Sequence, residues 1–416
     1  MGSYRNDPYR RPPPDDRLET MAVDSPTRPL TPTAPEDRPP RRLLPELDRP
    51  ADALRNLGPN WFAAVMGTGI VGNAAIALPV GGQALRPAAT VVWALACLLL
   101  LALLGAWTAH AVRHPERARA LAGHPVMGHF WGAPAMALLT VGAGTVALGA
   151  DVLGTAVAVR AGAVLWAAGT ALGLLTCVAV PYRTMTGSPA PADAAFGGWL
   201  MPVVPPMVSA ATGAALVPHL PAGQPRLTLL LVCGALFGVS LFSSLILLPQ
   251  LWSRLVHHGT GPAALVPTLW MVLGPLGQSV TAVHLLADAA PGVLPQPYAA
   301  AARAAVPLYG VPVWGFALMW LALAAALTVR QARLGLPFSL AWWGFTFPVG
   351  TCVTASAGLA QRLGSDLFTG TALALYAFLV LAWLTVSART ARAALRGGIF
   401  LPPPGPAPAP EGTPRL

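Results

Sequence analysis

The sequence is poor in charged residues. Only 10% of its 416 residues are charged, against about 25% in soluble domains. Lys is absent, so all 26 basic residues are Arg, whereas hydrophobic residues make up 55% of the chain. This composition excludes an ordinary soluble domain and a disordered chain, and it leaves the membrane class. Without Lys there is no GxxxxGK[ST] phosphate loop, which excludes ATP-driven pumping by this chain.

Residues that bind metals or form disulfides are also scarce. The four cysteines lie far apart in apolar runs without CxxC spacing, at Cys97, Cys177, Cys233 and Cys352, and we expect buried thiols. Five histidines fall in two predicted loops, at positions His114, His124, His129, His257 and His258. Their spacings match no metal-ligand motif, so we interpret them as solvated loop residues and expect no metal and no cofactor.

Long apolar runs dominate the middle of the chain. A hydrocarbon core about 30 Å thick requires roughly 20 apolar residues per helix. Ten runs without Asp, Glu, Lys or Arg meet this length, at about 60–80, 88–112, 130–150, 161–180, 197–218, 227–251, 262–287, 304–329, 337–360 and 367–388. Barrel strands would give shorter, alternating segments. We therefore predict an all-α membrane protein with ten transmembrane helices.

The two ends of the chain differ from this middle. Residues 1–55 hold ten Arg, ten acidic residues and twelve Pro, without the layout of a signal peptide. We predict a disordered segment at 1–59, a transmembrane domain at 60–388 and a basic, Pro-rich tail at 389–416. Arg is concentrated on the side of the two tails, so both termini are predicted to be cytoplasmic, in the plasma membrane. No basic cluster with interleaved aromatics indicates nucleic acid.

The odd-numbered runs share a period and a chemical irregularity. Their starts, 60, 130, 197, 262 and 337, are separated by 70, 67, 65 and 75 residues, which predicts five helical hairpins. Gly or Pro interrupts each of them, at Gly67, Gly69, Pro134, Pro202, Pro205, Pro206, Pro267, Pro275 and Pro348. Freed backbone groups are tolerated in a membrane only inside protein or facing water. These five helices should therefore line a central path.

Polar side chains near these interruptions have two interpretations. They are Thr68, Ser209, Gln278, Thr346 and Thr351, and they either line the path or bond neighbouring helices and their own turns, as most intramembrane hydroxyls do. With no basic residue in any run, anions would be attracted by the positive N-terminal ends of helices. His284, in the seventh run, is either a proton-linked site or an interhelical partner.

Five segments resemble the tellurite-resistance/dicarboxylate transporter family, which includes malate and sulfite transporters and plant slow anion channels. They are PNWFAAVMGTGIV (59–71), FWGAPAMALLTVG (130–142), MPVVPPMVSAATG (201–213), LGPLGQS (273–279) and FSLAWWGFTFP (338–348). The resemblance implies five hairpins around a central pore, a homotrimer and transport of small anions. It also implies that a phenylalanine on the ninth helix closes the pore. The match to FTFP places this role on Phe347, with Phe345 as the alternative.

We therefore expect an anion transporter or channel in the lipid bilayer. An enzyme is disfavoured because the runs lack acid–base or metal groups, and a receptor or scaffold acting through the N-terminal segment is the other class. C4-dicarboxylates such as malate rank first as substrate, with sulfite efflux or an inorganic anion channel as the alternative. The predicted pore-lining residues are Gly67, Thr68, Gly69, Pro134, Pro205, Pro206, Ser209, Pro275, Gln278, Thr346, Pro348 and Thr351.

Overall fold

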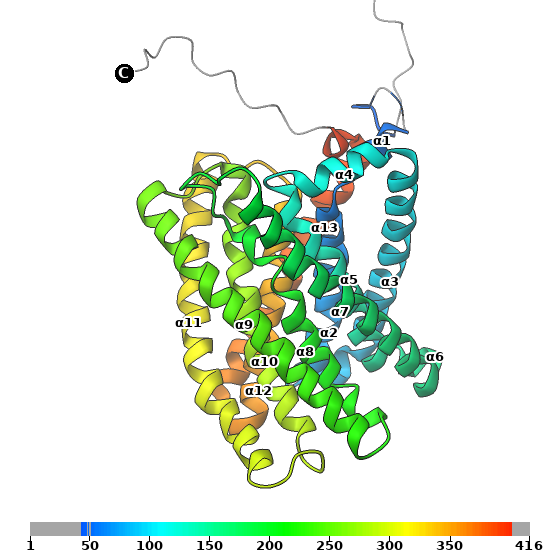
Figure 1. The fold of residues 1–416 in the computed structure, drawn as a ribbon, viewed down its shortest axis with the longest axis vertical. Coiled ribbons are helices and arrows are strands. Elements are labelled where there is room, and N and C mark those ends of the chain that lie inside the picture. Colours follow the sequence, from blue (N-terminus) through cyan, green and yellow to red (C-terminus); the bar gives the residue numbers. More distant parts are fainter. Residues whose placement is uncertain (1–42, 48, 50, 402–416) are drawn as a thin grey trace, which may run out of the picture. The chain divides into compact units, whose positions relative to one another are not determined.

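The described part of the chain is entirely helical. The structure, a computed structural model, describes residues 43–47, 49 and 51–401 (Figure 1), and these contain helices and turns but no strand. The all-α prediction is therefore confirmed for them. Most of the predicted disordered segment 1–59, and residues 402–416 of the predicted tail, lie outside the described residues.

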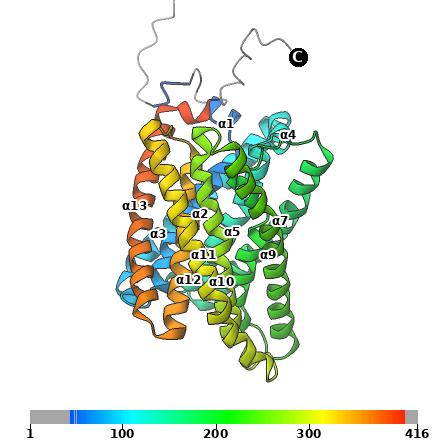
Figure 2. The ribbon, with the colours of Figure 1, turned by 90° about the vertical axis from the view of Figure 1, so that its left-hand side faces the viewer.

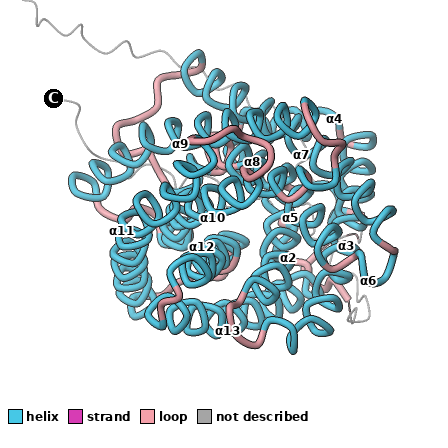
Figure 3. Tube along the Cα trace, turned by 90° about the horizontal axis from the view of Figure 1, so that it is seen from below, coloured by secondary structure: helices cyan, strands magenta, loops and turns pink. Residues whose placement is uncertain are grey.

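Five short helices form an inner ring. They are α2 (Phe62–Ala77), α5 (Gly132–Ala147), α8 (Pro205–Ala214), α10 (Leu273–Ala289) and α12 (Phe347–Leu363). Each contacts the next, and α12 returns to α2, so that the ring is closed (Figure 3). Nearly all residues of α2 from Phe62 to Ala75 are buried. Burial on nearly every side explains why α2 is apolar and carries no amphipathic stripe.

Five long helices surround the ring. They are α3 (Gly82–Arg113), α7 (Thr155–Thr186), α9 (Gln224–His258), α11 (Tyr298–Leu334) and α13 (Asp366–Arg396). Each packs against the inner helix that precedes it in the chain and against the next member of the ring (Figures 2 and 3). On α3 the buried stripe includes Trp93, Ala96 and Leu100, whereas Val91 and Leu98 are exposed. Exposed apolar side chains suit contact with lipid.

The inner helices begin in a common way. A 3-10 turn precedes each of them, namely η1 (Pro59–Trp61), η2 (Met127–Trp131), η3 (Gly197–Leu200), η5 (Ala263–Val272) and η6 (Leu340–Phe345). Proline follows in the first helical turn at Pro134, Pro205, Pro206, Pro275 and Pro348. At these positions the missing N–H breaks no α-helical hydrogen bond. The predicted interruptions are therefore points where a 3-10 turn changes to an α-helix. The prolines named above lie in the first turn of that α-helix.

Among the residues that the structure describes, seven segments are long and apolar enough to cross a membrane. They are the five outer helices together with Met127–Ala147 and Ala263–Ala289. The other three predicted spans contain α2, α8 and α12, which have 16, 10 and 17 residues. At 1.5 Å per residue these helices are about 15 to 26 Å long. The seven segments are consistent with the membrane class, and ten crossings remain a proposal.

The two described ends lie together beside the start of α2. The Leu44 N–H donates to the Leu395 carbonyl at 2.8 Å, and Leu47 is buried. Trp61 stacks on Phe400 at 5.1 Å between ring centroids. The remaining short elements are α1 (Asp52–Arg55), α4 (Pro115–Gly123), α6 (Ala150–Leu153), η4 (Val217–His219) and η7 (Gly398–Phe400). Residues within the predicted disordered segment therefore pack on the helical unit.

One histidine differs from its prediction. His129 is buried, because it lies in η2 rather than in a solvated loop. Its ring stacks on Trp199 at 5.6 Å, and its Nδ1 is 2.9 Å from the Pro125 carbonyl oxygen. His257 and His258, in the last turn of α9, are exposed as expected. Within the described ranges no three possible ligands lie close enough together to hold a metal ion.

Candidate functional site

The first turns of the inner helices converge on a constriction. It is a cavity of only about 20 Å³, lined by Ala63, Met66, Met136, Leu200, Met201, Val204, Met271, Gly274, Leu340, Trp343, Gly344, Phe347 and Pro348. The lining comes from α2, α5, α10 and α12, from the turns before α10 and α12, and from residues 200–204, which precede α8. A cavity needs at least about 10–15 Å³ of such space to hold one water molecule. The constriction has room for about one water molecule and is too small for a hydrated anion.

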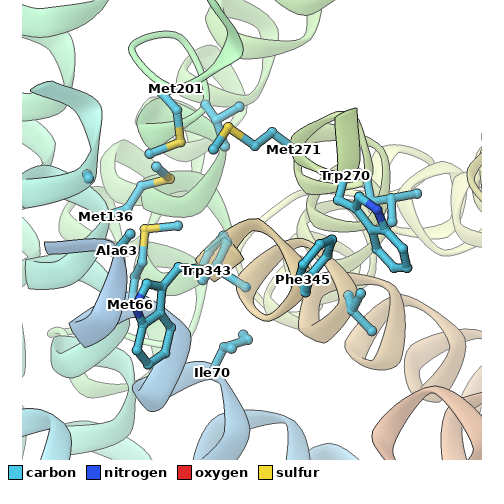
Figure 4. Close-up of a cluster of buried hydrophobic side chains, with 14 of the residues drawn as sticks. Ala63, Met66, Ile70, Met136, Met201, Trp270, Met271, Trp343 and Phe345 are labelled. Atoms are coloured by element: carbon cyan, nitrogen blue, oxygen red, sulfur yellow. The ribbon is translucent and has the colours of Figure 1, made fainter. Parts of the chain in front are cut away.

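Four methionines form much of this constriction. Figure 4 shows Met66, Met136, Met201 and Met271 gathered from separate segments of the chain. Methionine is flexible and fills irregular gaps, so these side chains can repack more easily than branched ones. The sequence interpretation missed them, although the first three lie in the motifs that carry the family resemblance. The available signal was a methionine near the start of four of the five inner helices.

A larger cavity lies beyond the constriction, between the C-terminal halves of the same helices. Its volume is about 340 Å³. The amide, hydroxyl and imidazole side chains in its lining are Asn73, Thr212, Gln278, Thr281, His284, Thr354 and Gln361. Most of them lie on α10 and α12, while α2, α5, α7 and α8 contribute mainly apolar residues. The cavity therefore has one polar wall.

Gln278 is a polar residue of this wall whose amide is free. Its side chain is 5% exposed, it lines the cavity, and it makes no hydrogen bond to any residue that the structure describes. By contrast, the Thr281 and Thr354 hydroxyls lie 2.8 Å apart and join α10 to α12. Asn73 donates to the Thr140 carbonyl at 3.0 Å. A buried amide without a protein partner needs water or a solute to satisfy it.

Two glycines allow the ring to close. A Cβ at Gly277 would lie 2.6 Å from the carbonyl carbon of Thr351, so α10 and α12 are in backbone contact there. A Cβ at Gly67 would overlap the Thr346 hydroxyl and the Trp343 ring. Any larger residue at either position would push neighbouring segments of the ring apart. These contacts explain Gly67 in the GTG motif and Gly277 in the LGPLGQS motif.

The twelve predicted pore-lining residues separate into two groups. Gln278 lines the larger cavity and Pro348 lines the constriction. The structure does not bring the other ten against either space, namely Gly67, Thr68, Gly69, Pro134, Pro205, Pro206, Ser209, Pro275, Thr346 and Thr351. All ten are buried in contacts within the helical unit. Their pore-lining role stays a prediction.

The hydroxyls in this second group bond within the protein. Thr68 accepts a hydrogen bond from an indole of α13 at 3.1 Å, and Ser209 accepts one from a threonine hydroxyl of α7 at 2.9 Å. Thr346 and Thr351 donate to carbonyls three residues earlier, at 2.7 and 2.6 Å. These contacts correspond to the alternative in which intramembrane hydroxyls join neighbouring helices or their own turns.

The two candidate phenylalanines have different surroundings. Phe347 is 2% exposed and lines the constriction. Phe345 lines neither space and packs edge-to-face against Trp270, with ring centroids 5.1 Å apart (Figure 4). Trp342 makes a second contact of this kind with Phe345, at 5.6 Å. Phe345 is therefore held in an aromatic cluster, and Phe347 faces the narrow space.

A basic hollow lies at the other end of the constriction. It has a volume of about 620 Å³, and its lining includes Arg55, Arg117 and His124. Leu340 lines both this hollow and the constriction, so the two spaces adjoin. Arg117 donates to the Asn56 side-chain oxygen at 2.8 Å. A positively charged hollow, an apolar constriction and a larger cavity thus follow one another along the ring.

These features are those of a multi-pass membrane protein whose inner helices enclose a small and a larger cavity. The sequence pattern of the voltage-dependent anion channel family matches residues 56–391, and the chain belongs to that family. It is thus a membrane anion transporter or channel, consistent with the expectation that it is not an enzyme. The predicted membership of the tellurite-resistance/dicarboxylate transporter family, which includes the slow anion channels, is confirmed.

Curated relatives cover most of the chain. It is 26% identical to an uncharacterized transporter of Methanocaldococcus jannaschii over 360 residues, which are 86% of this chain and 99% of the relative. It is 29% identical to a sulfite efflux pump of Trichophyton rubrum and 28% identical to one of Arthroderma otae. Each of these two matches extends over 322 residues, 76% of this chain and 85% of the relative.

Proposed function

We propose that this protein moves small anions across the plasma membrane along the axis of the inner ring. The observation that carries the proposal is the convergence of four inner helices, and of the segment that precedes α8, on one constriction, with a larger space on either side of it. Ten crossings in five hairpins, cytoplasmic termini and a homotrimer with one path per subunit belong to the same proposal. Phe347 is the residue that closes the path.

Helix dipoles supply the attraction for anions. The inner helices all start at the constriction and run toward the larger cavity. The N-terminus of a helix carries about half a positive charge, which stabilises a nearby anion. Five such ends around one narrow point favour an anion without any basic side chain there. Partial charges bind weakly, which favours rapid passage over tight binding.

The preferred substrate in this proposal is sulfite, ahead of the C4-dicarboxylates that the sequence ranked first. Two observations support this order. Relatives at 28% and 29% identity are sulfite efflux pumps. The lining of the larger cavity contains no Arg, whereas two carboxylates on one molecule are best recognised by paired guanidinium groups. A compact anion matches the uncharged cavity better than malate does.

Flux through liposomes containing the purified protein tests this proposal. Sulfite efflux should exceed that from protein-free liposomes at least about tenfold, because the bilayer core excludes free ions. Malate, succinate, nitrate and chloride should move more slowly than sulfite. Faster malate than sulfite would reverse the substrate assignment and keep the transport proposal. No flux of any of these anions from correctly folded protein would reject it.

A further inference from the structure

Three ionisable side chains meet at the end of the larger cavity that lies away from the constriction. His284 lines the cavity and is 8% exposed. Its Nε2 lies 3.4 Å from one carboxylate oxygen of Asp288, and the other oxygen accepts a hydrogen bond from Arg362. Asp288 and Arg362 are more exposed than His284. The cluster therefore extends from the buried cavity lining, at His284, to the more exposed Asp288 and Arg362.

The cluster has unused hydrogen-bonding capacity. The Nδ1 atom of His284 and the Nε atom of Arg362 are buried, and neither has a partner among the described residues. An arginine Nε–H can only donate, and an imidazole that directs Nε2–H toward a carboxylate gains a second donor when it is protonated. Buried donors without acceptors are unfavourable. An anion is a suitable acceptor for either group.

The charge of the cluster depends on a single proton. With a neutral imidazole, the Asp288 carboxylate and the Arg362 guanidinium cancel. With a protonated imidazole, the cluster carries one net positive charge. The other elements that line this cavity, α2, α5, α7 and α8, contribute no charged side chain to it. On α12, the neighbour Gln361 is uncharged. Helices α9 and α11 also pack against α10, and α11 places the titratable Tyr309 there. Among the charged groups of the described residues, Asp288 on α10 and Arg362 on α12 are the ones that act on His284.

We propose that His284, Asp288 and Arg362 form an anion-binding site that takes up one proton with each compact anion. This inference rests on the proposed function and adds a proton dependence to it. When no external anion is bound, the Asp288 carboxylate pairs with protonated His284 and with Arg362. Because linkage is reciprocal, protonation of His284 strengthens anion binding by the same factor by which the anion strengthens protonation. Gln278 is positioned along the same helix to receive the anion next.

The chain offers a matched control for this cluster. Arg86 of α3 pairs with Asp151 of α6, with its Nε 2.6 Å from one carboxylate oxygen. This guanidinium holds the pKa of the Asp151 carboxyl below its ordinary value. Neither residue lines the larger cavity, and no imidazole is paired with Asp151 among the described residues. Asp151→Asn therefore breaks an Arg–Asp pair without altering the proposed site.

Sulfite flux at a series of pH values tests the inference. The purified full chain and its variants are placed in liposomes with equal pH on both sides, from 8 to 6. Sulfite has the same ionic forms for every variant at a given pH, so the ratio of variant to wild-type flux isolates the protein. One linked proton changes binding by at most about tenfold per pH unit. The ratio of His284→Gln flux to wild-type flux should therefore fall as the pH falls.

The other variants make the test independent of one substitution. Asp288→Asn should lower the sulfite concentration for half-maximal flux and flatten the pH profile, because Arg362 then offers its charge at every pH. Asp151→Asn should keep the wild-type profile. The inference is overturned if His284→Gln retains the wild-type profile, or if the two Asp variants behave alike. Absence of flux from the wild type would instead reject the proposed function.

Discussion

Gln278 and Ser209 are both polar residues of inner helices, but the structure gives them different surroundings. Gln278 faces the larger cavity without a protein partner, whereas the Ser209 hydroxyl accepts a bond from Thr170 and its carbonyl accepts one from Trp166. The sequence could show that both lie near interruptions of apolar runs. It could not show which way each points, because Thr170 is 39 positions from Ser209 and reaches it only after the ring has formed.

A pair of substitutions separates these roles. Gln278→Leu should lower anion flux several-fold without loss of thermal stability, because the amide makes no hydrogen bond within the described protein. Ser209→Ala should lower stability by about 1 kcal/mol, the usual net value of a hydrogen bond. Thermal unfolding in detergent and flux in liposomes measure the two effects. Normal flux in folded Gln278→Leu would remove this residue from the path.

At the level of helices, the period and the prolines together indicated which segments are central. Pro205 and Pro348 lie where helices begin, and a hydropathy pattern cannot distinguish such a start from a break within a helix. The short inner helix α2 is buried on nearly all sides because the other helices enclose it. For the same reason, no amphipathic stripe in its sequence could indicate which of its faces lines a cavity.

The contact between α10 and α12 depends on the absence of a side chain at Gly277. Gly277→Ala would place a methyl group against the backbone of Thr351, which cannot rotate away as a side chain can. Overpacking of this kind typically costs 1–3 kcal/mol in soluble cores. We expect reduced yield and thermal stability, measured by size-exclusion chromatography after heating. Gly274→Ala, where a Cβ meets no atom within 4 Å, is the matched control and should remain stable.

At the scale of the helical unit, segments far apart in the sequence complete one ring. The Trp383 indole bonds to Thr68 across 315 positions, and α13 thereby closes against α2. The regular spacing of the odd-numbered apolar runs predicted repeated hairpins. The order of contacts around the ring and the convergence of the four methionines are visible only in the folded structure. Spaces along the ring belong to the assembled unit, and no single helix contains the path.

Anion flux through Phe347→Ala tests the central claim. The claim is that anions pass along the axis of the inner helices and that the Phe347 side chain closes the constriction. Removing a side chain that lines a space of about 20 Å³ should open it, so anion flux through liposomes should rise several-fold. Phe345→Ala is the control, because loss of its contacts with Trp270 should cost about 3–5 kcal/mol and lower yield without opening the path. Unchanged or lower flux in folded Phe347→Ala would contradict the account.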